Sequence, residues 1–181
     1  MLKPTRILMS FLLFSATLHA NVAVTYSIQD KPYFSLEIAD SWRVNVGSET
    51  DTAKLPPGEV APPRVITLMP DDESVLWFGV WVPVYLRSLD EAQEYLSSLD
   101  DFLVENPTLV KTDDVDLNTM PARYFKGTGE RDGRPVDYFV MLFELSKEDI
   151  GVAIYIGSPD TTKAHLEELR SMMKSITPIR E

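Results

Sequence analysis

Largely apolar runs mark three parts of the chain and predict strands that are buried on both faces. Residues 138–143 read Tyr-Phe-Val-Met-Leu-Phe, and most of residues 150–156 are also apolar. Residues 75–84, VLWFGVWVPV, carry apolar side chains at both sets of alternating positions. A strand with one solvated face would alternate apolar and polar residues instead. We therefore expect a layer of helix or loop on each face of the sheet that contains these strands.

Turn signals arrange residues 120–156 as three adjacent antiparallel strands. Asp132-Gly133 lies between strands expected at residues 122–128 and 135–145, and an Asp-Gly pair favours the positive backbone angles of a tight hairpin. The short charged segment 146–149 suits a second hairpin turn. This meander is the predicted centre of the sheet.

The remaining strands are expected at residues 22–28, 33–38, 43–46, 64–69 and 109–117. Within residues 33–38, apolar and polar positions alternate, which predicts a half-solvated strand near a sheet edge. The segment from Gly47 to Pro63 contains four prolines and no apolar periodicity. It is therefore predicted to be a long surface loop.

Two segments have the apolar spacing of amphipathic helices. Ser88 and Glu91 form a capping box at the start of the first helix, and the Asn-Pro pair at 106–107 is expected to end it. Ser158 is the predicted cap of the second helix, which Pro178 ends. The predicted buried stripes are Leu89, Ala92, Leu96, Leu99 and Leu103 in the first helix, and Leu166, Leu169, Met173 and Ile176 in the second. The predicted fold class is α+β, an antiparallel sheet covered by helices on both faces.

The amino-terminal residues have the pattern of a secretory signal. Lys3 and Arg6 precede the apolar run 7–14, and small residues then lead to Ala20. An uncleaved anchor is the competing interpretation, but the apolar run is far shorter than the roughly 20 residues that span a bilayer. We predict a signal peptide at residues 1–20, cleaved near Ala20, and one domain at residues 21–181. The mature protein would then be periplasmic or secreted, with no stable membrane anchor.

The composition restricts the possible chemistry. The chain has no cysteine, so disulfides, thiolate metal sites and cysteine nucleophiles are excluded. Its formal net charge is −11, and cleavage after Ala20 would remove two basic residues and lower it to −13. A negative surface repels phosphate backbones, so no nucleic-acid partner is expected.

No catalytic or cofactor motif is present. His165 is the single histidine of the predicted mature chain, and we expect it to be exposed and structural. No G-x-S-x-G sequence occurs. Residues 114–118 begin like a calcium loop, but Thr119 stands where that loop needs glycine. Residues 127–133 contain spaced glycines but join two predicted strands, unlike a dinucleotide-binding turn. We expect no enzymatic activity, no cofactor and no metal.

The tryptophans are the remaining candidates for binding. Trp77 and Trp81 lie in a continuous apolar strand and are predicted core residues. Trp42 lies at a strand corner beside the predicted loop. Its ring could anchor a partner or close the end of the sheet. We assign the predicted partner-binding surface to Trp42, Tyr33, Lys54 and Arg64.

Two segments and the order of elements resemble the PsbP-like superfamily. Residues 33–42 read YFSLEIADSW, which looks like the opening strand of that family, and residues 171–176 read SMMKSI, which looks like its closing helix. The resemblance covers nearly all of residues 26–178. It implies an α/β/α sandwich, shared with a small nuclear Ran-binding protein and bacterial secretion chaperones. It also implies a protein that works mainly by binding other proteins.

Three functional hypotheses follow. The first is a secreted or periplasmic accessory protein that binds another envelope protein through the 47–63 loop and the corner at Trp42. The second is a carrier of a small molecule or lipid, because aromatic and methionine side chains are available to line a cavity under the helices. The third is a carboxylate-dependent hydrolase, although no pair of acidic residues is distinguished by its position.

Overall fold

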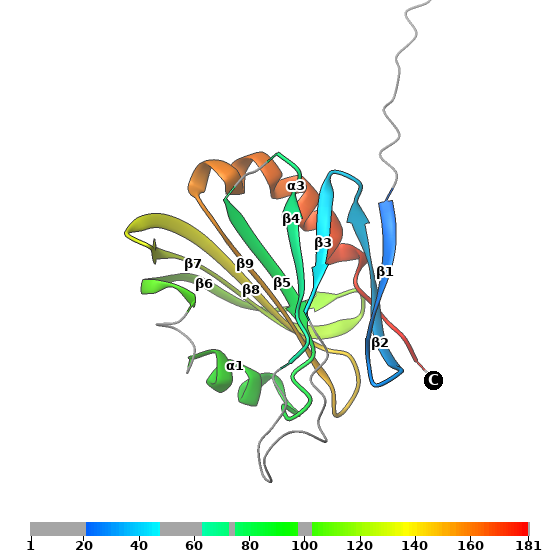
Figure 1. The fold of residues 1–181 in the computed structure, drawn as a ribbon. Helices are drawn as coiled ribbons and strands as arrows, with labels where there is room; N and C mark the ends of the chain where they lie inside the picture. The colour runs from blue at the N-terminus through cyan, green and yellow to red at the C-terminus, as the bar shows by residue number, and fades with distance from the viewer. Residues whose placement is uncertain (1–20, 48–62, 73–74, 98–102, 181) are drawn as a thin grey trace, which may run out of the picture.

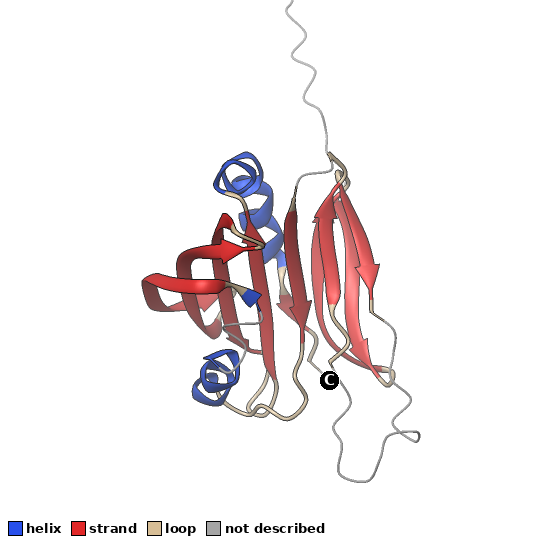
Figure 2. Cartoon of the chain, turned by 60° about the vertical axis from the view of Figure 1, so that its left-hand side comes forward, coloured by secondary structure: helices blue, strands red, loops and turns tan. Residues whose placement is uncertain are grey.

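The computed structural model describes residues 21–47, 63–72, 75–97 and 103–180, and residues 1–20, which hold the predicted signal, lie outside these ranges. The elements are β1 (Asn21–Ile28), β2 (Lys31–Ala39), β3 (Trp42–Val46), β4 (Ile66–Pro70), β5 (Leu76–Trp81), α1 (Leu89–Ser97), β6 (Glu105–Leu117), β7 (Met120–Arg131), β8 (Arg134–Glu144), β9 (Ile150–Gly157), α3 (Pro159–Ser175) and β10 (Thr177–Pro178). Within the described ranges the fold is α+β, with two helices and two antiparallel sheets (Figures 1 and 2). The large sheet has the strand order β3-β4-β5-β9-β8-β7-β6, and the small sheet has the order β1-β2-β10.

The predicted meander is confirmed and lies in the large sheet. Strands β8 and β9 pair near its middle, and β7 pairs with β8 on the other side. Asp132 and Gly133 have φ angles of 53° and 68°, so the turn has the positive backbone angles expected of a two-residue hairpin. Every residue of β9 is buried. This strand is therefore interior on both faces, as its apolar sequence predicted.

The described strands form two sheets instead of one, and β2 does not lie near the edge of the larger sheet. Phe34, Leu36 and Ile38 are buried, as the alternation predicted. However, β2 is the middle strand of the small sheet, between β1 and β10. β10 has two residues and follows α3. A strand of this length is too short to show an alternating pattern, so the sequence did not predict it. The small sheet lies at the β3 side of the large sheet (Figures 1 and 2).

The predicted helix stop at Asn106-Pro107 is wrong. The described part of α1 ends at Ser97, and both residues lie inside β6. Asn106 has a φ of 49°, and the register shifts between Glu105 and Thr108. Among the described strands, β6 pairs only with β7 and is therefore an outer strand. An edge strand with a bulge tolerates proline because one row of N–H groups needs no partner strand.

The α1 cap differs slightly from the predicted capping box. The Glu91 N–H donates to Ser88 Oγ at 3.1 Å, which confirms Ser88 as the cap. Glu91 Oε2 accepts from the N–H of Arg87 at 2.7 Å, one residue before Ser88. Ala92 is buried and Leu96 is half-buried, while Leu99 of the predicted stripe lies outside the described residues.

Ser158 caps α3 as predicted, but the buried face of the helix differs from the predicted stripe. The Thr161 N–H donates to Ser158 Oγ at 3.2 Å. Leu169 and Met172 are buried, whereas Met173, which was predicted to be buried, is only half-buried. This difference places Met173 at the border between α3 and an open part of the sheet.

Aromatic stacking joins the two sheets into one core. The Tyr26 ring is stacked on Phe34 with centroids 5.0 Å apart, and Phe34 meets the edge of Phe143 at 6.0 Å. Trp81 is buried and Trp77 is half-buried, with their rings 6.4 Å apart. Trp81 is therefore a core residue, as predicted, whereas Trp77 is only partly buried and packs against the core.

Candidate functional site

Trp42, the main residue of the predicted partner surface, lies in the interior. It begins β3 and is 5% exposed. Its indole Nε1 donates to Glu168 Oε2 at 2.9 Å, and its ring lies 5.5 Å from the imidazole of His165. The ring thus packs under α3, which does not fit the surface anchor predicted for it.

The other predicted binding residues lie apart from Trp42. Tyr33 is half-buried, and its ring meets Tyr26 with centroids 6.4 Å apart. The Arg64 carbonyl accepts from the Tyr26 O–H at 2.7 Å, and Arg64 Nε donates to the Gly47 carbonyl at 3.1 Å. Tyr33 and Arg64 are therefore brought together around Tyr26. Lys54 and the rest of the predicted loop lie outside the described residues.

His165 is not exposed, contrary to the prediction. Its side chain is 12% exposed, with Nδ1 2.9 Å from Glu168 Oε2 and Nε2 3.1 Å from Asp72 Oδ2. The Ser41 hydroxyl donates to Glu168 Oε1 at 3.2 Å. The imidazole is thus held between two carboxylates and fixes α3 to the turn after β4. This arrangement stabilises the packing of α3 against the rest of the fold.

The residues that looked like a calcium loop connect three elements instead. Asp114 of β6 accepts from Arg123 of β7 at 2.8 Å, and Arg123 also donates to Asp90 of α1 at 2.7 Å. Across the described ranges, no group of three or more histidine, cysteine, aspartate or glutamate residues could hold a metal ion. Neither described helix is long and apolar enough to span a bilayer.

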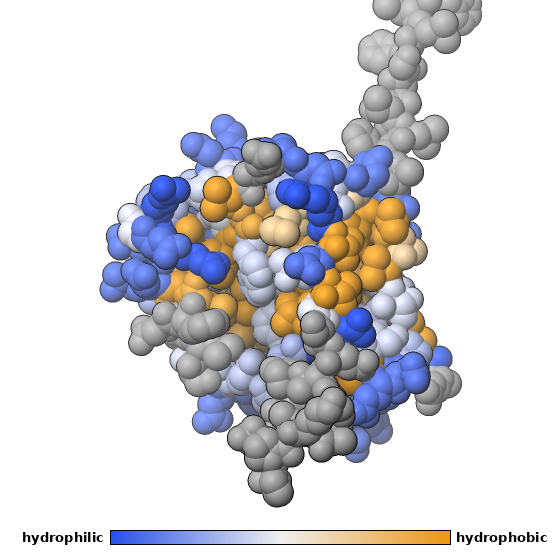
Figure 3. Space-filling view, in the orientation of Figure 1, coloured by the Kyte–Doolittle hydropathy of each residue, from blue (hydrophilic) through white to orange (hydrophobic). Residues whose placement is uncertain are grey.

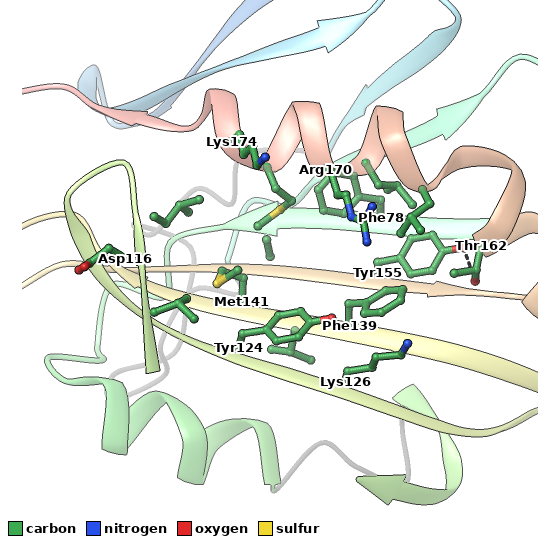
Figure 4. Close-up of a pocket in the computed structure, with 17 residues that line it drawn as sticks. Phe78, Asp116, Tyr124, Lys126, Phe139, Met141, Tyr155, Thr162, Arg170 and Lys174 are labelled. Atoms are coloured by element: carbon green, nitrogen blue, oxygen red, sulfur yellow. Dashed lines mark hydrogen bonds between the residues drawn. The ribbon is translucent and has the colours of Figure 1, made fainter. Parts of the chain in front are cut away.

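A groove of about 450 Å³ lies between α3 and the half of the large sheet formed by β6 to β8 (Figure 4). This volume is within the range of small-molecule pockets. Its walls are mainly apolar and aromatic. They include Val115, Leu117, Tyr124, Phe139, Met141, Tyr155, Leu166, Leu169 and Met173. This groove is our candidate functional site.

The local periodicities explain why these side chains meet. Alternate residues of a strand point to the same face, so Tyr124 and Lys126 of β7 both face the groove, as do Phe139 and Met141 of β8. On α3, residues three and four apart share a face. Leu166 is followed at this spacing by further groove residues, namely Leu169, Arg170, Met173 and Lys174.

The rim of the groove is positively charged, although the chain as a whole is acidic. Lys126, Arg170 and Lys174 line it together with one carboxylate, Asp116. Arg170 Nη1 donates to Glu167 Oε1 at 2.6 Å at the outer surface of α3. Cations from β7 and α3 therefore face each other across an apolar groove.

The hydroxyl groups deep in the groove bond to each other. Tyr155 Oη and Thr162 Oγ1 are 2.9 Å apart, and Thr162 Oγ1 also donates to the carbonyl of Ser158 at 2.9 Å (Figure 4). Burial raises the pKa of Tyr155, so this phenol stays protonated. A bound molecule would meet mainly apolar atoms at this end.

The sequence predicted part of this site. The alternative carrier hypothesis noted that aromatic and methionine side chains are available to line a cavity, and Tyr124, Phe139 and Met141 line the groove under α3. The cations were missed, because Lys126 and Arg170 are 44 positions apart in the printed sequence. The only local signal for Lys126 and Arg170 is that each is a charged residue at a position where its strand or helix faces the groove.

No protein-family model matches the chain, and no curated protein matches it significantly. Solved structures do resemble it. Cyanobacterial PsbP (CyanoP) from Synechocystis has a TM-score of 0.61 at 7% identity, covering 90% of this chain and 96% of that one. LpqN of Mycobacterium tuberculosis, which is involved in cell envelope biogenesis, has a TM-score of 0.58 at 12% identity, covering 89% and 91%.

A third solved structure is PA94 of Pseudomonas aeruginosa, a protein of unknown function. Its TM-score is 0.51 at 14% identity, covering 88% of this chain and 99% of that one. At these identities the likeness concerns the fold. The chain has the PsbP-like fold that its sequence resembled.

Proposed function

We propose that the protein is a non-enzymatic accessory protein of the cell envelope that binds an apolar or amphiphilic small molecule in the groove beneath α3. The observation that carries this proposal is the groove itself, about 450 Å³ with mainly apolar walls. A concave apolar site with a few polar groups at its rim is typical of ligand-binding proteins. The predicted secretory signal and the likeness to an envelope-biogenesis protein support the location.

We also infer that helices cover both faces of the large sheet. Phe125 and Tyr138 share a hollow with Gln93 and Leu96 of α1. The neighbouring residue Phe139 lines the groove under α3. Because successive strand residues point to opposite faces, α1 and α3 would shield opposite sides of β7 and β8. The floor of the groove would then be supported from behind by α1.

The proposal is tested with the uncharged fluorescent probe N-phenyl-1-naphthylamine. The wild-type protein should bind it, and Met173→Trp, which fills the groove, should abolish binding. The matched control is Ser171→Trp, which places the same side chain at an exposed position of the same helix and should bind normally. Thermal unfolding of both variants establishes that they are folded. Unchanged binding by Met173→Trp, or no binding by the wild type, would rule out the groove.

Exposed apolar residues on β3 favour a second function, the protein binding that the sequence first suggested. Val44 is 39% and Val46 is 42% exposed on this outer strand of the large sheet. Figure 3 shows hydrophobic surface on this side of the molecule. Contiguous exposed apolar surface often marks a protein interface.

This second function is tested by cross-linking in envelope fractions. A photoreactive residue at Val44 should capture a defined protein, and Val46→Asp should abolish that capture. The same photoreactive residue at Lys163, on the exposed face of α3, serves as control. Identical products from both positions would show that β3 has no specific partner.

A further inference from the structure

Two cations of the groove flank one aromatic pair. The rings of Tyr124 and Phe139 are stacked with centroids 6.2 Å apart, and Lys126 Nζ lies 5.5 Å from the Phe139 centroid. Arg170 extends from α3 on the other side of these rings from Lys126 in the view of Figure 4. Burial raises the pKa of Tyr124, and the charge of Arg170 opposes this increase, which agrees with their proximity. An ammonium and a guanidinium therefore lie on either side of one aromatic pair that includes a phenol O–H (Figure 4).

Lys126 and Arg170 each have N–H donors that can bond to a further acceptor. Among the described residues, no carboxylate lies within ion-pair distance of the Lys126 ammonium. The ammonium lies over the Phe139 ring instead. Arg170 bonds to Glu167 through Nη1, and a guanidinium has five N–H donors. Both side chains can therefore donate charge-assisted hydrogen bonds to an anion bound at this part of the rim.

The charges around the rim favour an anion with a single charge. Lys126, Arg170 and Lys174 contribute three positive charges, while Asp116 and Glu167 contribute two negative charges. The carboxylates of Asp113 and Asp137 also act on Tyr124 and Tyr155 of the groove. These carboxylates would repel a second negative charge on the ligand, so a carboxylate head fits better than a phosphate monoester.

The interior of the groove requires an apolar tail. Leu169 and Leu117 are buried in its walls, and the Tyr155 and Thr162 hydroxyls are already bonded to each other. A charged group placed there would lose its hydration without gaining partners, which is strongly unfavourable. A ligand that satisfies both parts of the site has a charged head at the rim and a hydrocarbon chain along the groove.

We propose that the groove binds a single-chain fatty-acid anion, with its carboxylate between Lys126 and Arg170 and its chain along α3. The volume of about 450 Å³ is at the lower end for small-molecule sites and suits one chain rather than two. This assignment rests on the proposed function of the groove and adds the chemical class of its ligand.

The test compares three amphiphiles with the same chain, measured by displacement of N-phenyl-1-naphthylamine. Dodecanoate should bind about tenfold more tightly than dodecan-1-ol, since the head adds charge-assisted hydrogen bonds. Dodecylamine should be the weakest. Raising the NaCl concentration to about 0.5 M should reduce the advantage of dodecanoate, because salt screens exposed charges.

The double variant Lys126→Gln/Arg170→Gln should bind dodecan-1-ol as the wild type does and lose the preference for dodecanoate. The control variant Lys147→Gln/Lys163→Gln removes two exposed cations outside the groove and should keep that preference. Lys126→Arg should keep it too, since the charge remains.

Three results would overturn the assignment. These are equal affinities for dodecanoate and dodecan-1-ol, an unchanged preference in the double variant, and tighter binding of dodecyl phosphate than of dodecanoate. In each case N-phenyl-1-naphthylamine would still bind, so the groove would stand as a binding site and only the head group would be wrong. Failure of the probe itself to bind would instead overturn the proposed function.

Discussion

The indole Nε1 of Trp42 donates a hydrogen bond to Oε2 of Glu168 at 2.9 Å. This bond connects the first residue of the outer strand β3 to the middle of α3, the helix that forms one wall of the groove. The same carboxylate group also accepts from Ser41 and contacts His165. The indole N–H of Trp42 is thus bonded within the protein to Glu168.

Replacing Trp42 with phenylalanine should destabilise the protein. The substitution removes the hydrogen bond to Glu168 and leaves part of the indole volume empty, at a cost of about 2–4 kcal/mol. Urea unfolding measures the loss. Glu168→Gln, which keeps an acceptor for the indole, should cost less. A Trp42→Phe variant of unchanged stability that had lost a binding partner would restore the surface role predicted from the sequence.

Stability should depend on pH through Glu168. Burial acts to raise its pKa, but hydrogen bonds from His165, Trp42 and Ser41 outweigh burial and hold the pKa below its ordinary value. Because the pKa is lower in the folded than in the unfolded state, the carboxylate stabilises the fold above the unfolded pKa. This contribution is lost as the pH falls through the folded pKa.

The wild type should therefore lose more free energy of unfolding than Glu168→Gln as the pH falls from about 5 to about 3. Urea unfolding at several pH values measures both curves. Parallel curves would contradict a stabilising role for the ionised carboxylate.

Asn118 should stabilise the end of α3. Its Nδ2 donates to the carbonyl of Ile176 at 2.9 Å and also to that of Lys174, and its φ is 48°. Asn118→Ala removes the hydrogen bonds and strains the backbone, which should cost about 2 kcal/mol. Glycine adopts the positive φ without strain, so Asn118→Gly should recover only the part of the lost stability that comes from backbone strain. If Asn118→Gly were as stable as the wild type, the side-chain bonds would contribute nothing.

Tyr26 should make the protein sensitive to alkali. Burial raises the pKa of Tyr26 to about 12, although a backbone hydrogen bond at Val82 and the charge of Arg64 act in the opposite direction. Since the folded pKa exceeds the unfolded value of about 10, the stabilisation is complete below that value and is lost as the pH rises towards 12.

Over that range the unfolding free energy of Tyr26→Phe should fall less steeply than that of the wild type. At neutral pH the variant should be less stable by about 1 kcal/mol, because it lacks the hydrogen bond to the Arg64 carbonyl. Identical alkaline slopes would show that Tyr26 ionises at its ordinary pKa.

Short-range rules explain which expectations succeeded. The Asp132-Gly133 turn, the Ser88 and Ser158 caps and the continuous apolar strand β9 each depend on residues that are close in the chain. Their backbone conformation follows from local sterics and hydrogen bonding. The predicted helix stop failed because Pro107 lies on an edge strand, and only strand pairing determines which strand is the edge.

The sequence by itself determined the strands β1 to β9, the starts of the two helices with their Ser88 and Ser158 caps, and the supply of aromatic and methionine side chains for the groove. Only the tertiary structure decided that β10 closes a second sheet, that Trp42 lies under α3, and that Lys126 and Arg170 meet across one groove. Periodicity specifies which face of an element a residue occupies. It does not specify which distant face is opposite, because that depends on packing between elements far apart in the chain.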